Sequence, residues 1–323
     1  MPTYVEKKTE DFKAGEHVQG VFYIKESELK TTTTNNKYMN FTFADKTGEI
    51  NAKLWDWDED NASRFKAGIL VKARGSVIDW QGQLQFKIDS MGKVLESDNI
   101  KIDDYIPSAP YTGEAMYKFL FTVINEKMND EEFKTLCTYI LEENKSQLLI
   151  APAAKKNHHA VRSGLLYHTT TMLRGALTLS SIYTFLNKNL LYTGVILHDI
   201  GKLYEMKQND TGLVSEYTVE GTLLGHIIQG INYIDEVGKK LGINPEKVLL
   251  IKHMILSHHY IPEHGSPKSP AFPEAEMLHH LDILDARMYD MQQAVEGTET
   301  GSFSERIWSL ENRSVYKSSA IYD

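Results

Sequence analysis

The period of the apolar residues changes near residue 100 of this 323-residue chain. Before that point apolar and polar residues alternate, as in residues 39–43 and 50–55, and a period of two is typical of half-buried β strands. From Tyr111 onward apolar residues recur every three or four positions, as in Phe133, Leu136 and Ile140, which is typical of helices. The sequence therefore predicts an α+β multidomain protein, strand-rich first and helical afterwards.

The N-terminal region contains five candidate strands separated by turns. They lie at residues 18–24, 39–43, 50–55, 71–78 and 83–88, with a helix-like gap at 58–65. Five short strands with one such gap suit a small closed barrel of the OB type. The alternation directs the odd-numbered residues 39–43, the even-numbered residues 50–54, and Leu84, Phe86 and Ile88 into the barrel.

The opposite face of these strands carries Tyr38, Lys53 and Trp55. Aromatic rings offer a stacking surface for the bases of a single strand, and a lysine offers charge for its phosphates. These side chains are therefore candidates for binding single-stranded RNA, and also single-stranded DNA. The competing interpretation, that Tyr38 and Trp55 only cover hydrophobic surface, is equally compatible with the sequence.

The composition and turn residues suggest four segments. We expect an OB-fold nucleic-acid-binding domain at 1–95 and a linker at 96–112, which has two prolines near its end. A helical domain follows at 113–296, with only helices and short polar turns between 165 and 296. The tail at 297–323 contains Trp308 and Leu310 and is expected to pack on the helical domain.

Charge and cysteine content exclude several classes of protein. The net charge of −9 means that a polyanion must be held by a local groove or by metal ions, because the overall field repels it. The single cysteine, Cys137, excludes an internal disulfide and a cysteine-rich metal site. The sequence lacks an apolar run of about 20 residues and an apolar signal core, so we expect a cytoplasmic protein without a membrane partner.

Histidines are concentrated in the helical region. One series of His and Asp residues falls on predicted helices or at their ends: His168, His198, Asp199, His226, His258, His259 and Asp282. Taken singly, a helical histidine is more often a hydrogen-bonded core or surface residue than a ligand. Asp199 and Asp282, however, lie among apolar neighbours, where a buried carboxylate is costly unless it is paired or coordinated. One metal centre between helices explains the whole series.

The order of these residues resembles the signature of the HD-domain metal phosphohydrolases. His168, the His198-Asp199 pair and Asp282 match it, and His226 with the His258-His259 doublet is similar to the two-metal members. With the barrel ahead of this signature, the whole chain resembles the bacterial 3′–5′ exoribonucleases of the YhaM type, which combine an OB-fold with an HD domain. Residues 158–165, 265–270 and 305–308 are also similar to that family.

The resemblance implies two bound Mn²⁺ ions, with Co²⁺, Fe²⁺ or Mg²⁺ as alternatives. Asp199 would bridge the ions; His168, His198 and Asp282 would complete one site, and His226, His258 and His259 the other, with one histidine of the doublet as an alternative outer ligand. Lys202 would neutralise charge on the phosphoryl group, and His159, Arg162 and Lys268 would contact phosphate or sugar. A solvated helix end or loop is the competing interpretation for each of these four. His279 and Asp285 would support Asp282.

The implied activity is hydrolysis of single-stranded RNA from its 3′ end to nucleoside 5′-monophosphates, by a chain expected to form a homo-oligomer. Two alternatives stay open. One is a non-catalytic single-stranded nucleic-acid-binding protein, and the other is an HD-type phosphodiesterase of nucleotides or cyclic dinucleotides. The cyclic-dinucleotide class carries a Gly-Tyr-Pro element after its doublet, whereas here Tyr260, Ile261 and Pro262 follow.

Overall fold

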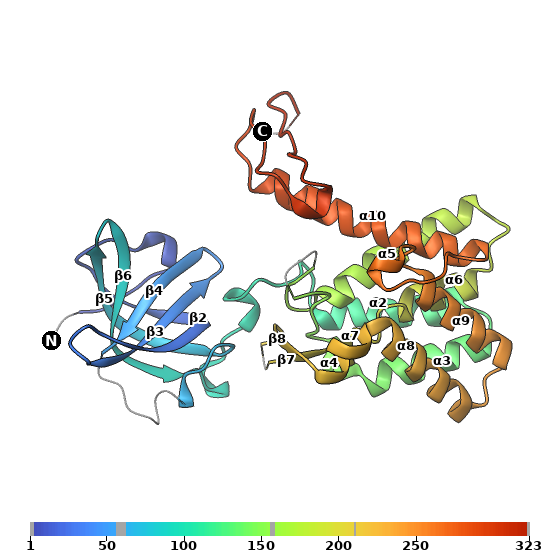
Figure 1. The fold of residues 1–323 in the computed structure, drawn as a ribbon, viewed down its shortest axis with the longest axis horizontal. Coiled ribbons are helices and arrows are strands. Elements are labelled where there is room, and N and C mark those ends of the chain that lie inside the picture. Colours follow the sequence, from blue (N-terminus) through green and yellow to red (C-terminus); the bar gives the residue numbers. More distant parts are fainter. Residues whose placement is uncertain (1–2, 56–62, 156–158, 210, 322–323) are drawn as a thin grey trace. The chain divides into compact units, whose positions relative to one another are not determined.

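The computed structural model describes residues 3–55, 63–155, 159–209 and 211–321. The chain divides into two compact units (Figure 1). The first comprises Met1–Ser108 together with Asn209–Leu213, and the second comprises Ala109–Gln208 and Val214–Asp323.

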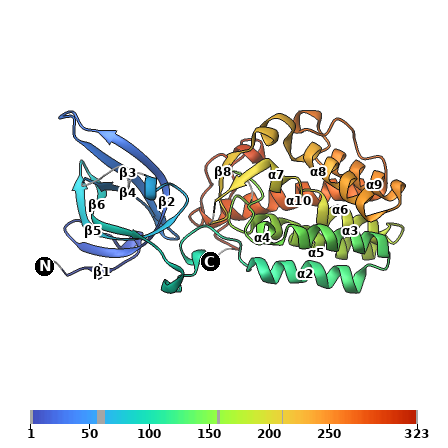
Figure 2. The same ribbon diagram turned by 90° about the horizontal axis from the view of Figure 1, so that it is seen from below.

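The first unit is built on one closed sheet. Its strands are β1 (Val5–Glu6), β2 (His17–Thr31), β3 (Lys37–Asp45), β4 (Gly48–Leu54), β5 (Leu70–Trp80) and β6 (Gln83–Lys93). The order is β1-β2-β3-β4-β6-β5, and an additional β2–β5 pairing closes β2 to β6 into a barrel (Figures 1 and 2). The β4–β6 pairing is parallel, and the other pairings within the barrel are antiparallel. A five-stranded closed barrel of this kind is an OB-fold, as the alternation predicted.

Aromatic side chains fill the barrel. Phe22, Phe41, Phe43 and Phe86 are fully buried, and the rings of Phe22 and Phe43 stack with centroids 5.3 Å apart. The predicted inward direction of Leu84 was wrong, because its side chain is 40% exposed near the β5–β6 turn, beyond the filled interior. Most of the predicted helix-like gap at 58–65 lies outside the described residues.

The second unit is mainly helical. Its helices are α2 (Gly113–Lys127), α3 (Glu131–Glu143), α4 (Lys145–Leu148), α5 (Gly164–Ile182), α6 (Lys188–Leu197), α7 (Lys202–Glu205), α8 (Val219–Leu241), α9 (Pro245–Ser257) and α10 (Pro273–Glu296). One prediction was wrong here: β7 (Met206–Gln208) and β8 (Val214–Tyr217) form a hairpin where only helices and turns were expected. The side chain of Asn209 accepts hydrogen bonds from the backbone of Thr211 and Leu213 and so shapes the connection.

Polar side chains begin the helices, and burial holds them together. Side chains of Thr112, Asp130, Asn187, Thr218 and Asn244 accept hydrogen bonds from the first backbone N–H groups of α2, α3, α6, α8 and α9, respectively. Helix α6 is buried at every position from Leu190 to Leu197 and packs against α3, α5, α9 and α10 (Figure 2). Its C-terminal end therefore lies inside the helical unit.

The C-terminal segment folds onto α10. Leu310, in the short helix Trp308–Leu310, is fully buried, and the Arg287 guanidinium donates to Glu311 Oε2 at 3.0 Å. Within the described part of the chain, every helix is too short or too polar to span a membrane.

Candidate metal centre

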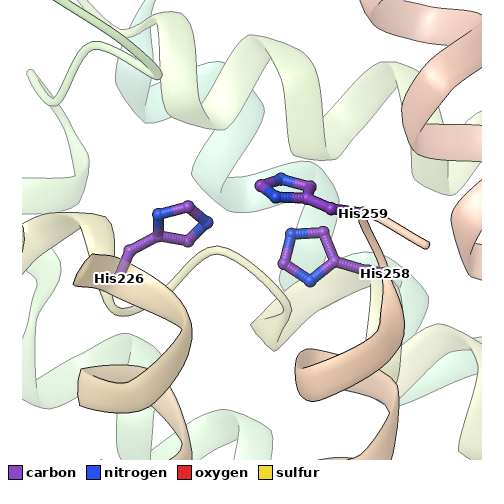
Figure 3. Close-up of side chains that lie close together, drawn as sticks. All are labelled: His226, His258 and His259. Atoms are coloured by element: carbon purple, nitrogen blue, oxygen red, sulfur yellow. The ribbon is translucent and has the colours of Figure 1, made fainter. Parts of the chain in front are cut away.

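Five helices or helix ends bring the predicted His and Asp residues together. His168 lies on α5, the His198-Asp199 pair follows α6, His226 lies on α8, the His258-His259 doublet follows α9, and Asp282 lies on α10. Figure 3 shows the rings of His258 and His259 turned toward the ring of His226 from the opposite helix. His168, His198, Asp199 and His258 are buried, and His226, His259 and Asp282 are partly buried, which is unusual for this many polar groups.

The ligand atoms form two groups. Those of His168, His198 and Asp282 lie within 4.8 Å of one another, and so do those of His226, His258 and His259. Asp199 lies between the groups: its Oδ2 is 3.3 Å from His198 Nε2, and its Oδ1 is 3.5 Å from His226 Nε2. Because each oxygen of one carboxylate faces a different group, Asp199 has the geometry of a bridging ligand.

Hydrogen bonds of the Nδ1 atoms orient three of the histidine rings. The Nδ1 atoms of His198 and His258 lie 2.9 and 2.7 Å from the carbonyls of Val195 and Ile255. A carbonyl only accepts hydrogen bonds, so both Nδ1 atoms carry the proton and both Nε2 lone pairs point into the cluster. Asp285 Oδ2 lies 2.7 Å from His168 Nδ1 and orients that ring in the same way. Such outer contacts are typical of metal-binding histidines.

A kink in α8 places His226. Gly225 has φ +69° and ψ 167°, a backbone conformation that interrupts the helix and that residues with a side chain rarely adopt. The break frees the backbone N–H of His226, which donates to Glu205 Oε1 at 3.1 Å, and the ring Nδ1 lies 3.4 Å from the same oxygen. Glu205 therefore fixes both the backbone and the ring of His226.

Three buried atoms in the cluster have no hydrogen-bond partner among the described residues. They are Asp199 Oδ1, His226 Nε2 and His258 Nε2. A buried polar atom without a partner is costly, and three facing one space are explained by a cation that accepts their lone pairs. Imidazole nitrogens and carboxylate oxygens suit Mn²⁺, Fe²⁺, Co²⁺ or Zn²⁺. The residues present thus fit a divalent cation.

The electrostatics of the cluster favour charged aspartates. Burial alone would raise the pKa of Asp199, but the Lys202 ammonium and His198 hold it well below its ordinary value. Burial would lower the pKa of His168, but hydrogen bonds to Asp282 and Asp285 raise it to about 9. Burial lowers the pKa of His258, which keeps that ring neutral and able to bind a cation.

The remaining residues predicted to contact substrate differ in their burial and in their distance from the cluster. Lys202 Nζ lies 2.7 Å from Asp199 Oδ2 and is buried rather than solvated. His159, predicted to touch substrate from a loop, is 1% exposed, and its Nε2 lies 2.8 Å from Asp285 Oδ2. Arg162 is half-buried, and Lys268 is exposed in the loop before α10. The structure thus brings Lys202 into the cluster and links His159 to it through Asp285.

The predicted barrel residues form one surface of the first unit. The rings of Tyr38 and Trp55 stack with centroids 4.6 Å apart, and Lys53 Nζ lies 5.3 Å from the Tyr38 ring. Trp55 is 44% exposed, so part of this residue is accessible from solvent.

Glu205 and Gly225 were not among the predicted site residues. The signal for Glu205 was its position three residues after Lys202, and the signal for Gly225 was a glycine directly before a candidate ligand. Neither pattern is specific without the fold, because α7 and α8 must meet for Glu205 to reach His226.

Comparisons with known proteins agree with both units. A family model described as the HD domain matches residues 165–287, and one described as the OB-fold nucleic acid binding domain matches residues 24–94. The chain is thus an OB-fold protein with an HD-type phosphohydrolase domain.

Close relatives make the identification more specific. The chain is 37% identical to the 3′–5′ exoribonuclease YhaM of Halalkalibacterium halodurans over 95% of its length and 94% of that protein. The proteins of the same name from Geobacillus sp. and Shouchella clausii are 40% and 38% identical, over 95% of this chain and 93% and 95% of theirs. The chain belongs to the YhaM family of 3′–5′ exoribonucleases.

Proposed function

We propose that this protein is a metal-dependent 3′–5′ exoribonuclease that hydrolyses single-stranded RNA to nucleoside 5′-monophosphates. The observation that carries the proposal is the position of Asp199, whose two oxygens face two groups of candidate ligands. Membership of the YhaM family supports the direction of degradation and the RNA substrate.

We propose Asp199 as the bridging ligand of two divalent ions, with Mn²⁺ as the cofactor. His168, His198 and Asp282 would hold one ion, and His226, His258 and His259 the other. Bound there, the ions would supply a nucleophile at neutral pH and neutralise charge on the phosphate. Competition among Mn²⁺, Co²⁺, Fe²⁺ and Mg²⁺ for activation of the metal-free protein tests the choice of ion, and the highest rate at micromolar Mn²⁺ is the expected result.

Lys202 contributes a fixed positive charge next to the bridging carboxylate. Burial would lower the pKa of its ammonium, but Asp199 outweighs that effect and raises it. The ammonium therefore stays protonated at neutral pH, 2.7 Å from Asp199 Oδ2. In our proposal it orients that carboxylate and attracts a phosphate oxygen of the strand.

The barrel surface of Tyr38, Lys53 and Trp55 would hold the strand by stacking and charge. We propose Arg162 and Lys268 as phosphate contacts, and His159 as a residue that orients Asp285 in addition to its predicted contact with substrate. We also propose that single-stranded DNA binds the same surface and that the chain forms a homo-oligomer. Light scattering coupled to size-exclusion chromatography tests the oligomer: a mass near 36.8 kDa would contradict it.

A strand-degradation assay tests the function. RNA labelled at its 5′ end is incubated with the protein and Mn²⁺, or with EDTA. Products that shorten progressively from the 3′ end, only with the metal, are the expected result. Asp199→Asn, which keeps the shape but loses the bridging charge, should abolish shortening while RNA binding persists. An intact strand with all four ions, or cleavage of cyclic dinucleotides alone, would refute the proposal.

A further inference from the structure

The residue that follows the histidine doublet has an unusual backbone. Tyr260 has φ +65°, in the left-handed region that residues other than glycine and asparagine rarely occupy. Its N–H donates to the Ser257 carbonyl at 2.9 Å, and the N–H of Ile261 donates to the His259 carbonyl at 2.7 Å. These two bonds make a tight turn of the backbone at Tyr260. A strained aromatic residue beside a candidate active site suggests a role for its ring.

The Tyr260 ring lies against a second ring. The centroids of Tyr260 and His279 are 4.9 Å apart, and the ring planes are inclined by 33°. His279 is itself held in place, because its Nδ1 lies 2.7 Å from the carbonyl of His258. Tyr260 nevertheless remains 44% exposed. We call this pair the aromatic platform: one ring is anchored to the protein, and the other presents aromatic surface to the exterior.

The aromatic platform borders both groups of candidate ligands. Tyr260 directly follows His259, and His279 contacts the carbonyl of His258, so one border is the second group. On α10, His279 lies three residues before Asp282, which places both on the same side of the helix next to the first group. A nucleotide whose phosphate reaches the cluster carries its base only one sugar away. An exposed ring at this border can therefore meet that base.

We propose that the aromatic platform stacks the nucleobase of the 3′-terminal nucleotide while the adjoining phosphodiester lies at the metal centre. This inference rests on the proposed function. Stacking on an aromatic ring accepts any base, because every base has a π face. It would thus hold the terminal nucleotide without imposing a sequence preference.

Two variants test the role of the ring without disturbing the turn. Tyr260→Asn removes the ring and tolerates the left-handed backbone, whereas Tyr260→Phe keeps the ring. We expect Tyr260→Asn to lower kcat/KM about 5- to 100-fold on RNA with an ordinary 3′ nucleotide, the range of one base–aromatic stack. On RNA with an abasic 3′ residue it should match the wild type, and Tyr260→Phe should stay within about threefold on both substrates.

Binding gives a readout that does not require turnover. RNA with 2-aminopurine at its 3′ end is mixed with the full-length protein in EDTA, which keeps the strand intact. Stacking on the platform should quench 2-aminopurine fluorescence with the wild type and Tyr260→Phe, and not with Tyr260→Asn. Tyr183→Asn is the matched control: Tyr183 is 45% exposed, contacts Phe185, and lies about 22 Å along α5 from His168.

The outcomes separate this inference from the function on which it rests. If the wild type does not shorten RNA with any of the four ions, the proposed function fails. If the wild type shortens RNA but Tyr260→Asn slows ordinary and abasic ends equally, the platform proposal is wrong and Tyr260 has only a structural role. Equal quenching by wild type and Tyr260→Asn would also overturn it.

Discussion

At the scale of single residues, the site depends on Asp199, whose two carboxylate oxygens face different groups of candidate ligands. Its Oδ2 faces His198 and the Lys202 ammonium, and its Oδ1 faces His226. The Lys202 ammonium keeps this buried carboxylate ionised, so both oxygens keep their lone pairs for ligation. The arrangement also explains why a lysine is buried here: its charge is compensated at 2.7 Å.

Replacement of Lys202 tests the contribution of its charge. Lys202→Met has a similar volume and no charge, and we expect kcat to fall about 10²- to 10³-fold, as for loss of one preorganised electrostatic contact. Lys202→Arg should recover part of the rate because it restores the charge. The metal content of each purified variant, measured by inductively coupled plasma mass spectrometry, distinguishes lost catalysis from lost metal. An unchanged kcat for Lys202→Met would contradict the assigned role.

At the scale of secondary structure, one glycine decides whether α8 can supply a ligand. Gly225→Ala should weaken binding of the second ion, because alanine disfavours the conformation that turns His226 toward Glu205. Titration calorimetry with Mn²⁺ should show the stoichiometry falling from about two toward one. Gly242→Ala is the control, because Gly242 also has a positive φ but ends α8 in open space. It should cost about 1 kcal/mol of stability and leave metal binding unchanged.

The first turn of α3 provides a pH-dependent test of stability. Asp130 caps this helix and lies 2.6 Å from Lys247 Nζ, and although burial raises its pKa, Lys247 more than offsets this and lowers it. Its contribution is therefore present above the unfolded pKa of about 3.9 and lost as pH falls through the lower folded value. Asp130→Asn keeps the cap and should lower the free energy of unfolding by up to about 1 kcal/mol at pH 7.

Urea denaturation at several pH values measures that difference. The difference in the free energy of unfolding should stay constant between about pH 7 and pH 5 and narrow as the pH falls below about 4. Glu220→Gln, at an exposed acid in the first turn of α8, should change stability by less than about 0.5 kcal/mol at any of these pH values. A gap between wild type and Asp130→Asn that does not narrow as the pH falls below about 4 would contradict the assignment.

How far the sequence predicts the fold depends on the kind of signal. Alternation and helical periodicity predict the barrel and most helices, because burial of one face imposes a period on the residues. The series of His and Asp residues predicts which side chains lie together in the candidate metal centre. Contacts between distant segments leave no such period: Glu205 with His226 and the burial of His159 against Asp285 follow only from the tertiary fold. The β7–β8 hairpin is local, but its strands of three and four residues are too short to show a clear alternation.

At the scale of the whole molecule, substrate length should separate the contributions of the two units. The double variant Tyr38→Ala, Trp55→Ala removes the stacked surface of the barrel. We expect KM for a 20-nucleotide RNA to rise about 10- to 100-fold, the range of one to two lost base stacks, with hydrolysis of a dinucleotide unchanged. A similar loss on both substrates would show that the barrel surface does not bind the strand.

Metal binding should also stabilise the helical unit. An ion that binds only the folded chain adds about 2.7 kcal/mol at a concentration of 100 Kd, which corresponds to roughly 5–10 °C in Tm for a unit of this size. Differential scanning fluorimetry with Mn²⁺ and with EDTA measures the shift. Asp199→Asn, which should bind the ions weakly, serves as the control and should show a much smaller shift. Equal Tm values for the wild type in both conditions would argue against two bound ions.

The candidate ligands come from α5, α6, α8, α9 and α10 and span residues 168 to 282. With a single, buried cysteine, the chain cannot form an internal disulfide. The ions would act as cross-links instead, because each would connect helices that are separated by tens of residues. Unlike a disulfide, such a cross-link would be removed by a chelator. Metal supply would then set the lifetime of the folded protein as well as its rate of turnover, and metal-starved molecules would be the first to be degraded.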